Sequence, residues 1–434
     1  MDQIFASLVL VVAFFSFLAM GVWVAISLLA AGLLGFVLLL DVPAGQILAT
    51  TVWGSNNSWA LAALPLFIWV GEILFRSNMS KDLFSGLAPW LEPLPGGLLH
   101  VNIVGCGIFA AVSGSSAATC ATVGRMSVPE LRERKYDENM IVGTLAGSGT
   151  LGLLIPPSII LIVYGVATEE SISRLFLAGV GPGFMMLGLF MGYVIVWSFF
   201  NRSKMPARSQ PRLSFAQKVS QSGRLMPILL LITGVIGSIY AGIASPTDAA
   251  AVAVLISFLL VWKQGDFSFD LFKESLKGAA RTSCMIVFIL SAASYLTVAM
   301  GFAGIPRSLA TWIGDLGLSQ GALLFALMIF FIVLGCFLDG ISIVVLTTAV
   351  IVPMIEVVGI DRIWFGIFLV LVVEMSQITP PVGFNLFVLQ GITDRNILQI
   401  AKTAIPFFLL LMVGLALIIF FPEIVLTIPN QMNR

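Results

Sequence analysis

The sequence predicts an all-α protein that crosses a membrane many times. Of its 434 residues, 59% are hydrophobic and only 10% are charged, and the mean hydropathy is +1.06. A soluble domain carries about 25% charged residues. Apolar runs of about 20 residues, the length of a helix that crosses a bilayer, recur along nearly the whole chain. The ten-residue alternation of a membrane β-barrel is not seen, so a polytopic helical membrane protein is expected.

About ten spanning helices are expected. Residues 4–40 form one apolar run that would be about 55 Å long as a single helix, so two spans joined by a turn near Gly21 are expected there. The other spans are expected at residues 53–75, 139–165, 174–200, 225–243, 246–262, 282–302, 362–390 and 403–421.

Two further apolar regions, residues 98–126 and 320–358, are predicted to form re-entrant hairpins. Each is long and has a polar, glycine-containing middle. Non-helical backbone is tolerated at membrane depth only where protein or a cavity covers it. The spans at 139–165 and 362–390 are predicted to be broken, because each contains a double proline.

The basic residues indicate which loops face the cytoplasm. Residues 201–224 contain no acidic residue and six basic ones, Arg202, Lys204, Arg208, Arg212, Lys218 and Arg224. Lys and Arg are enriched on the cytoplasmic side, so this segment is predicted to be a cytoplasmic linker. The loops at 125–135 and 263–281 fall on the same side by the span count, and both termini fall outside.

Residues 265–280 have a different pattern from the spans. Phe267, Phe269, Phe272 and Leu276 alternate there with charged residues. A surface loop is one interpretation, and a helix that lies flat on the membrane is the favoured one.

The sequence contains an internal repeat. TLGLLIPPS at residues 150–158 corresponds to EMSQITPPV at 374–382, and the same offset of 224 relates Asp137 to Asp361 and Pro182 to Pro406. Upstream, Ser113 is matched to Asp339 at an offset of 226, and Gly105 to Gly335 and Gly71 to Gly301 at 230, with small insertions to explain the drift. Five full spans separate equivalent elements, so the second copy is predicted to be inverted. Inverted repeats with broken helices are typical of secondary transporters.

The hairpin tips and the breaks are predicted to bind Na⁺. They offer hydroxyls and freed carbonyls without soft ligands, and hard cations prefer oxygen. Few carboxylates are present, which suits a monovalent cation, and half-helix C-terminal ends face cations in such transporters. The expected sodium-binding residues are Ser113, Gly114, Ser115, Ser116, Gly147, Ser148, Thr150, Asp339, Gly340, Ser342, Ser376, Thr379 and Pro380.

An anionic substrate is predicted to lie between the two cation sites, at half-helix N-termini. The expected substrate-binding residues are Ser116, Thr119, Gly149, Pro156, Thr347, Thr348 and Asn385. The alternative for any one of these small residues is close helix–helix contact, where Gly, Ser and Thr are common in membranes. Asn385 could instead bond the broken backbone.

Acidic residues inside the apolar segments are few, and such residues are functional candidates by default. Asp339 is interpreted either as a cation ligand or as an acceptor for the amides of its hairpin tip, and Glu374 stands out within a span. Glu72 is expected to reach an interface, and pairing with Arg76 four residues on is its structural interpretation. Asp137 and its repeat equivalent precede spans and are expected to cap helices.

Several classes of function are disfavoured by the sequence. The formal net charge is zero, which gives no reason to expect nucleic acid as a partner. His100 is the only histidine, and the four cysteines lack metal-ligand spacing. No GxxxxGK[ST] loop indicates ATP binding. We therefore expect no enzyme and no organic cofactor.

The chain resembles the large membrane subunit of TRAP (tripartite ATP-independent periplasmic) transporters. The resemblance rests on stretches in the family's order along most of the chain, with Asp248 where Glu is usual: LAALPLFIWVGEIL (61–74), SGSSAATCATVGRM (113–126), GTLGLLIPPSIILIVYG (149–165), LFLAGVGPG (175–183), YAGIASPTDAAAVAV (240–254), GIDRIWFGI (359–367) and TPPVGFNLFV (379–388).

The resemblance implies a subunit of the bacterial inner membrane. It implies Na⁺-driven import of an organic acid, of the sialic acid or C4-dicarboxylate type, which a periplasmic binding protein delivers. A small four-helix membrane subunit, expected to be a separate chain, completes such complexes within the lipid bilayer. The family's fold is similar to elevator-type ion transporters, in which a transport domain moves against a scaffold.

That similarity implies a division of the chain by residue range. Scaffold helices are expected at 1–75 and 225–302, transport-domain halves at 76–200 and 303–434, and the cytoplasmic linker between them at 201–224. A stand-alone symporter of Na⁺ and an organic anion is the main alternative, and a passive channel is a weaker one.

Overall fold

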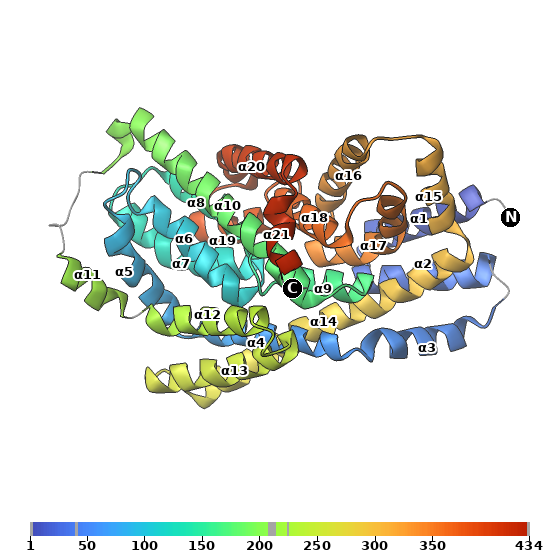
Figure 1. Ribbon diagram of the computed structural model, residues 1–434, viewed down its shortest axis with the longest axis horizontal. Coiled ribbons are helices and arrows are strands. Elements are labelled where there is room, and N and C mark those ends of the chain that lie inside the picture. The colour runs from blue at the N-terminus through green and yellow to red at the C-terminus, as the bar shows by residue number, and fades with distance from the viewer. Residues whose placement is uncertain (1–2, 40–41, 207–213, 224, 432–434) are drawn as a thin grey trace.

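The computed structural model describes residues 3–39, 42–206, 214–223 and 225–431, and every regular element in these residues is a helix (Figure 1). The first half of the chain contains α1 (Gln3–Ala19), α2 (Val24–Leu39), α3 (Ala44–Asn56), the 3-10 helix η1 (Trp59–Ala62), α4 (Ala63–Arg76), α5 (Met79–Leu91), α6 (Leu99–Ser113), α7 (Ser116–Glu133), α8 (Glu138–Thr150), α9 (Ile159–Thr168) and α10 (Ile172–Phe200). A connection with η2 (Arg202–Lys204) and α11 (Phe215–Ser222) follows.

The second half repeats this order of helices. It contains α12 (Met226–Tyr240), α13 (Pro246–Lys263), α14 (Phe269–Phe302), α15 (Ile305–Asp315), α16 (Gln320–Gly335), α17 (Gly340–Val357), α18 (Arg362–Gln377), α19 (Phe384–Thr393), α20 (Ile397–Phe420) and α21 (Glu423–Gln431). Each helix of the first half has an equivalent in the second, starting with α1 and α12 and ending with α10 and α20. The first residues of equivalent helices are separated by a nearly constant number of residues. The predicted repeat therefore extends over nearly the whole chain, with α3 and α4 together equivalent to α14.

Helix contacts between the halves come in symmetric pairs. Helix α2 packs on α14, and α13 packs on α4; α7 packs on α19, and α17 packs on α9; α8 packs on α20, and α18 packs on α10. Each contact has a partner in which the two halves exchange roles. The two repeats are therefore related by an approximate two-fold axis, and in Figure 1 their hairpins lie on opposite halves of the molecule.

The predicted spans all contain helix, but fewer are long continuous helices than the ten expected. Six described helices are long and apolar enough to cross a membrane, namely η1 with α4, α10, α13, α14, α17 and α20, and the bent pair α11–α12 would be a seventh. The two spans expected within residues 4–40 are the shorter helices α1 and α2, of 17 and 16 residues, with Gly21 at φ +79° between them. The spans with double prolines are each divided in two.

The segment at 265–280 differs from its prediction. Instead of a separate surface helix followed by a span, residues from Phe269 on form the first part of α14, a continuous helix of 34 residues. Ser268 caps this helix by accepting a hydrogen bond from the Leu271 N–H. Gly278 does not interrupt it, and its missing side chain leaves room for the Glu72 carboxylate of α4. Glu72 also pairs with Arg76 at 3.0 Å, as predicted.

The helix caps correct the upstream part of the predicted repeat. Asp137 and Asp361 cap α8 and α18, as predicted, and are related by the offset of 224. Ser115 and Asp339 cap α7 and α17 and are related by the same offset, so the match of Ser113 to Asp339 at 226 was wrong. Gly105 lies in the middle of α6 and Gly335 at the end of α16, and Gly71 and Gly301 likewise differ in helix position. No insertion is needed between the hairpin tip and the double proline.

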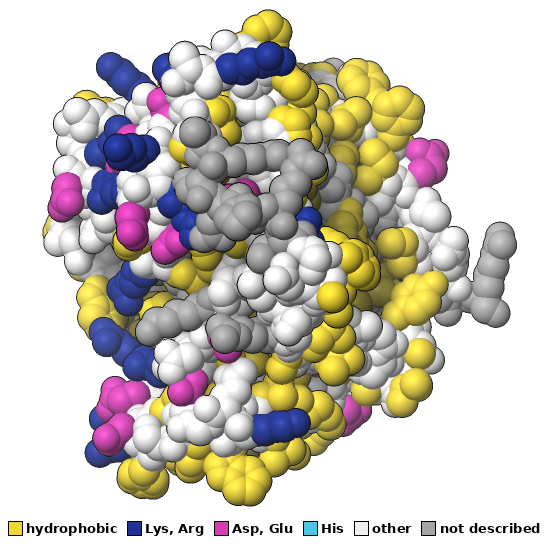
Figure 2. Space-filling model, turned by 90° about the vertical axis from the view of Figure 1, so that its left-hand side faces the viewer, with side chains coloured by type: hydrophobic (Ala, Val, Ile, Leu, Met, Phe, Trp, Pro, Cys, Tyr) yellow, Lys and Arg dark blue, Asp and Glu magenta, His cyan; other side chains and the backbone are white. Residues whose placement is uncertain are grey.

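The three basic loops lie at one end of the molecule. Arg125 lies over the Phe75 ring at 5.7 Å, and Asn78 near the end of α4 donates to Asp266 at 2.7 Å. Lys204 lies 3.9 Å from Asp137 at the start of α8. Figure 2 shows this end of the molecule, with Lys and Arg gathered mainly on one flank and hydrophobic side chains on the other. Arg208, Arg212 and Arg224 of the predicted basic linker lie outside the described residues.

Candidate functional site

The first hairpin, α6 and α7, turns at Gly114 and Ser115. Gly114 has φ +60°, a left-handed conformation that favours glycine. The Ser113 and Thr119 hydroxyls hydrogen-bond at 2.7 Å, and the Ser113 hydroxyl also donates to the Ser115 carbonyl. Ser115 caps α7 with its side chain, which accepts from Ala118 at 3.4 Å. The sequence thus correctly located a polar hairpin tip here.

The first break, residues 151–158, separates α8 from α9 and fits directly against this tip. The Ile159 N–H donates to the Gly114 carbonyl at 3.3 Å. A Cβ on Gly152 would lie 2.5 Å from the Ser115 carbonyl oxygen, closer than real atoms approach. Ser158 accepts from the Leu161 N–H and caps α9, and its hydroxyl also donates to the Leu153 carbonyl. The tip and the break of the first repeat therefore form one tightly packed unit.

The second hairpin tip, residues 336–339, also reaches the first break. A Cβ on Gly340 would lie 3.3 Å from Ile160 Cδ1 and 3.7 Å from Leu153 Cδ1. The same Cβ would lie 2.7 Å from Val373 on α18. The first break is thus bordered by both hairpin tips and by the helix that leads to the second break.

Asp339 acts as an acceptor for the amides of its own tip. Its carboxylate accepts from the Ile341 N–H at 3.1 Å and from the Ser342 N–H at 3.3 Å, and the Ser342 hydroxyl donates to its second oxygen. This is one of the two interpretations that the sequence left open. The role of Asp339 as a cation ligand stays a prediction.

The second break, residues 378–383, separates α18 from α19. It contacts the second tip through the Cys336 thiol, which donates to the Pro380 carbonyl at 3.3 Å, and Gly335 lies directly against Ser376. Ser376 and Thr379 donate back to the carbonyls of Val373 and Met375, both at 2.7 Å. Their hydroxyls satisfy the last turn of α18.

Glu374 and Thr150 face each other between the two repeats. The Glu374 carboxyl lies on α18, is completely buried, and is oriented toward the Thr150 hydroxyl and the Leu154 backbone of the first break. The contact is loose, because neither carboxyl oxygen has a hydrogen-bonding partner of good geometry among the described residues. Thr150 and Glu374 are related by the repeat offset of 224 and so occupy equivalent positions. The approximate two-fold axis passes near this pair.

Other unpaired polar groups flank the second break. Asn385, at the start of α19, is completely buried, and neither its amide oxygen nor its amide nitrogen has a partner among the described residues. The same holds for the amide nitrogen of Gln377. Buried polar groups are nearly always hydrogen-bonded in folded proteins. Together with Glu374, which lies one turn before the second break, these residues leave several buried polar atoms without partners among the described residues.

Three predicted residues of the first repeat contact neighbouring helices. A Cβ on Gly147 would meet the Phe407 ring of α20 at 2.5 Å, and one on Gly149 would meet Cys120 of α7 at 2.8 Å. The Ser148 hydroxyl donates to the Thr144 carbonyl of its own helix at 2.6 Å and reaches the Asn102 carbonyl of α6 at 3.4 Å. Close helix contact, the alternative that the sequence left open, accounts for the small size of these residues.

The predicted substrate-binding residues are all buried, but they do not all lie together. Ser116, Thr119, Gly149 and Pro156 belong to the unit formed by the first tip and the first break. Thr347 instead lines an apolar cavity of about 370 Å³ between the second hairpin and α1, α14 and α15. Its hydroxyl donates to the Ile343 carbonyl at 2.8 Å, so it is already paired. Glu374 and Gln377 are the residues that our predicted set omitted, although an acid within an apolar span was the signal for Glu374.

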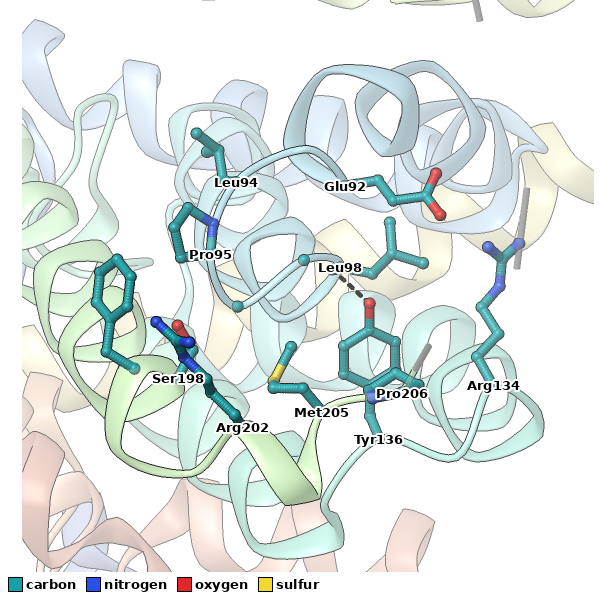
Figure 3. Close-up of a pocket in the computed structure, with 13 residues that line it drawn as sticks. Glu92, Leu94, Pro95, Leu98, Arg134, Tyr136, Ser198, Arg202, Met205 and Pro206 are labelled. Atoms are coloured by element: carbon teal, nitrogen blue, oxygen red, sulfur yellow. Dashed lines mark hydrogen bonds between the residues drawn. The ribbon is translucent and has the colours of Figure 1, made fainter. Parts of the chain in front are cut away.

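Two polar cavities lie at the basic end of the molecule, away from the breaks. The first, of about 460 Å³, is shown in Figure 3, where Arg134 and Arg202 lie on opposite sides and the Leu98 N–H donates to the Tyr136 hydroxyl at 3.0 Å. Glu92 lies on the same side as Arg134. The second, of about 560 Å³, lies where α10 ends and α8 and α20 begin.

Comparison with known proteins identifies the family. The sequence matches the family described as "Tripartite ATP-independent periplasmic transporter, DctM component" over residues 11–424. The chain belongs to this family. Its resemblance to TRAP large subunits is thereby confirmed, and the family is one of transporters.

Relatives of this DctM-family chain match nearly its full length. It is 32% identical over 398 residues to the C4-dicarboxylate TRAP transporter large permease protein DctM of Pseudomonas aeruginosa, covering 92% of each chain. It is 30% identical over 411 residues to the isethionate TRAP transporter permease protein DctMQ of Oleidesulfovibrio alaskensis, covering 94% of this chain and 64% of that protein. The fold is similar to the YdaH transporter of Alcanivorax borkumensis, with a TM-score of 0.63 at 15% identity over 88% of this chain and 90% of that one.

Proposed function

We propose that this chain is the large permease subunit of a Na⁺-coupled importer of a small organic acid. A periplasmic binding protein delivers the acid, and a small four-helix membrane subunit completes the complex. The family is tripartite, and relatives are named for C4-dicarboxylate and isethionate, both small organic anions. We take the C4-dicarboxylate class as the first substrate to test and a sialic acid as the second.

The unpaired polar groups at the breaks carry this proposal. Glu374, Gln377 and Asn385 are buried with polar atoms that lack partners among the described residues. An isolated buried carboxylate is costly, and a bound cation offsets that cost. Thr150 beside Glu374 and the serines of the first tip supply neutral oxygens, which suit a monovalent ion.

Helix ends add the electrostatics that an anionic substrate needs. Helices α7, α9 and α17 all have their N-terminal ends beside the first break. The positive ends of these helix dipoles and their first N–H groups favour an anion. The C-terminal ends of α6 and α8 lie in the same region and favour a cation. A cation and a carboxylate bound side by side would neutralise each other.

We propose an elevator mechanism because the site residues are buried. Uptake requires that they reach each side of the membrane in turn. The symmetric pairs α2–α14 and α4–α13 form a helix layer along the lower side of Figure 1, and the hairpins and breaks lie above it. This arrangement supports the division into scaffold (1–75 and 225–302) and transport parts (76–200 and 303–434).

The membrane in question is the bacterial inner membrane, with the basic end of the molecule in the cytoplasm. The clustering of Arg125, Arg134, Arg202 and Lys204 at one end supports this orientation through the enrichment of Lys and Arg on that side. Helix α1 begins at the opposite end in Figure 1, and this end is therefore placed outside.

The test is uptake by proteoliposomes that contain the whole complex. A radiolabelled C4-dicarboxylate is added with the binding protein, with an inward Na⁺ gradient or with equal Na⁺ on both sides. We expect accumulation only with the gradient. Ser116→Ala and Asp339→Ala are expected to raise the Na⁺ concentration that gives half-maximal uptake, since both residues lie at hairpin tips.

Two outcomes separate this proposal from its rivals. Uptake by the chain without its partners would favour a stand-alone symporter. Flux that persists without a gradient and never accumulates substrate would favour a channel. An unchanged Na⁺ response in both tip variants would show that the ion binds elsewhere.

A further inference from the structure

The polar cavity where α10 ends contains more positive than negative charge. Lys204, Arg395 and Lys402 line it, and Asp137 is the acidic residue among its described lining. The Asp137 carboxylate is only partly available to neutralise these cations, because it caps α8 by accepting from the Met140 N–H at 3.0 Å. Its distance to Lys204 is 3.9 Å, which is a loose pairing.

The other two cations are not neutralised by an acid among the described residues. Arg395 donates at 2.7 Å to the side-chain oxygen of Asn139, which is neutral. Lys402 is exposed on the first turns of α20 and forms no ion pair within the part of the chain that the structure describes. The N-termini of α8 and α20 both open at this cavity and add positive potential. An anionic group is the ligand that this arrangement favours.

The surroundings of the cavity distinguish a lipid from a free anion. Tyr193 and Trp197 of α10 form part of its wall, and these residue types are enriched where the membrane meets water. Lys402 is followed on the same face of α20 by Ile405, Leu409 and Val413, which are 52%, 53% and 46% exposed. A phosphate bound at the cations would place attached acyl chains along this apolar stripe.

We propose that the cavity lined by Lys204, Arg395 and Lys402 binds the phosphate headgroup of an anionic phospholipid. The acyl chains lie along the exposed face of α20. The site is separate from the proposed ion and substrate site, so it does not depend on the proposed transport function. Basic pockets between membrane helices bind anionic headgroups by this chemistry.

The test is lipid enrichment in nanodiscs that contain the full-length chain. The discs hold phosphatidylglycerol and phosphatidylcholine in equal amounts, and the lipids retained after delipidation are counted by native mass spectrometry. Each basic residue near an anionic surface contributes about 1 kcal/mol, or about fivefold in affinity. Arg395→Gln with Lys402→Gln is therefore expected to lower the preference for phosphatidylglycerol about 25-fold.

A matched control removes two cations elsewhere. Lys263→Gln with Lys273→Gln changes the net charge equally, and both lysines are exposed on α13 and α14, away from the cavity. This control is expected to keep the preference, and so is Arg395→Lys, which keeps the charge. In the unaltered protein the preference is expected to weaken as salt is raised, because exposed charges are screened.

Three results would overturn the proposal. The first is an unchanged preference in the Arg395 and Lys402 double variant. The second is an equal loss in the Lys263 and Lys273 control, which would show only a general surface effect. The third is competition by inorganic phosphate or glycerol phosphate as strong as that by phosphatidylglycerol, which would indicate a site for soluble anions.

Discussion

The two repeats build the same helix break in different ways. The first break is buried except for half-buried Ile155, and Ser158 caps the helix that follows it. In the second break Pro381 is exposed, and Gly383, the N-cap residue of α19, offers no side-chain cap. The first break is therefore enclosed by protein, whereas the second is partly exposed and is flanked by Gln377 and Asn385, whose side chains have unpaired polar atoms among the described residues.

The hairpin tips show the opposite distribution. Asp339 satisfies two amides and one hydroxyl of the second tip, whereas Ser115 accepts a single bond at 3.4 Å in the first. The first tip is instead fixed by its contact with Gly152 and by the bond from Ile159 to Gly114. In the first repeat the tip and the break thus hold each other, whereas in the second repeat the tip is held mainly by its own Asp339 cap. We expect the second break to change most during transport.

The contact between the first tip and the first break gives the largest expected effect. Gly152→Ala places a Cβ against the Ser115 backbone, which cannot rotate away as a side chain could. Overpacking of this kind typically costs about 1–3 kcal/mol, and we expect the upper end of that range. Thermal unfolding of the purified chain measures it, and uptake is expected to fall with it.

Two controls sharpen this comparison. Ser376→Ala alters the equivalent position of the second repeat and only removes atoms, so a smaller loss of stability is expected. Gly188→Ala on α10 has open space around its Cβ and is expected to be neutral or stabilising. A loss for Gly188→Ala as large as for Gly152→Ala would contradict the tight contact.

The next largest effect is expected at Glu374, which faces Thr150 across the approximate two-fold axis. Glu374→Gln keeps the shape and removes the charge, and interactions with charged groups contribute about 1.5–3 kcal/mol. We expect uptake at limiting Na⁺ to fall about tenfold or more, while stability is unchanged or higher because an unpaired buried carboxyl is lost. Glu133→Gln, at the exposed end of α7, is the control. Normal Na⁺-dependent uptake in Glu374→Gln would remove this residue from the site.

The differences between the two repeats could not be predicted from the sequence, although the positions of the breaks, hairpins and helix caps could. The double prolines, the polar hairpin middles and the caps at Asp137 and Asp361 are local features, and the structure confirms them. The offset of the repeat even pairs Thr150 with Glu374. That they face each other depends on how α8 and α18 pack, which no local pattern specifies.

Other elements were missed for physical reasons. Helices α5 and α15 precede the hairpins and are amphipathic, with too little apolar length to be recognised as spans. The continuity of α14 was missed because charged residues and Gly278 resemble an ending, whereas contact with Glu72 supports the helix there. The close contacts of Gly147 with Phe407 and of Gly149 with Cys120 were also not foreseen, because a glycine that admits a ligand and one that admits a neighbouring side chain look alike in sequence.

The caps of the two tips predict a moderate difference in stability. Removing an N-cap side chain costs about 0.5–2 kcal/mol. Asp339→Ala is expected near the upper end because three donors lose their acceptor, and Ser115→Ala near the lower end because one weak bond is lost. Chemical denaturation of the two variants side by side measures the difference. Equal losses would mean that the two tips are held alike.

The smallest expected effect concerns an ion pair that is present in both repeats, with the positions of the basic and the acidic residue exchanged. Arg132 and Glu138 join α7 to α8 at 3.0 Å, and the offset of the repeat relates them to Glu356 and Arg362, which also pair. The pair is exposed, so each instance is expected to contribute about 0.2–1 kcal/mol.

Exchanging the two charges tests whether only their pairing matters. Arg132→Glu alone is expected to cost up to about 1 kcal/mol, and Arg132→Glu with Glu138→Arg is expected to recover most of it. In the second repeat, Glu356→Arg with Arg362→Glu should recover less of the lost stability. The Glu170 carboxylate lies 3.8 Å from the Arg362 guanidinium, so a carboxylate at position 362 would be repelled by it. Full recovery in the second repeat would show that Glu170 does not interact there.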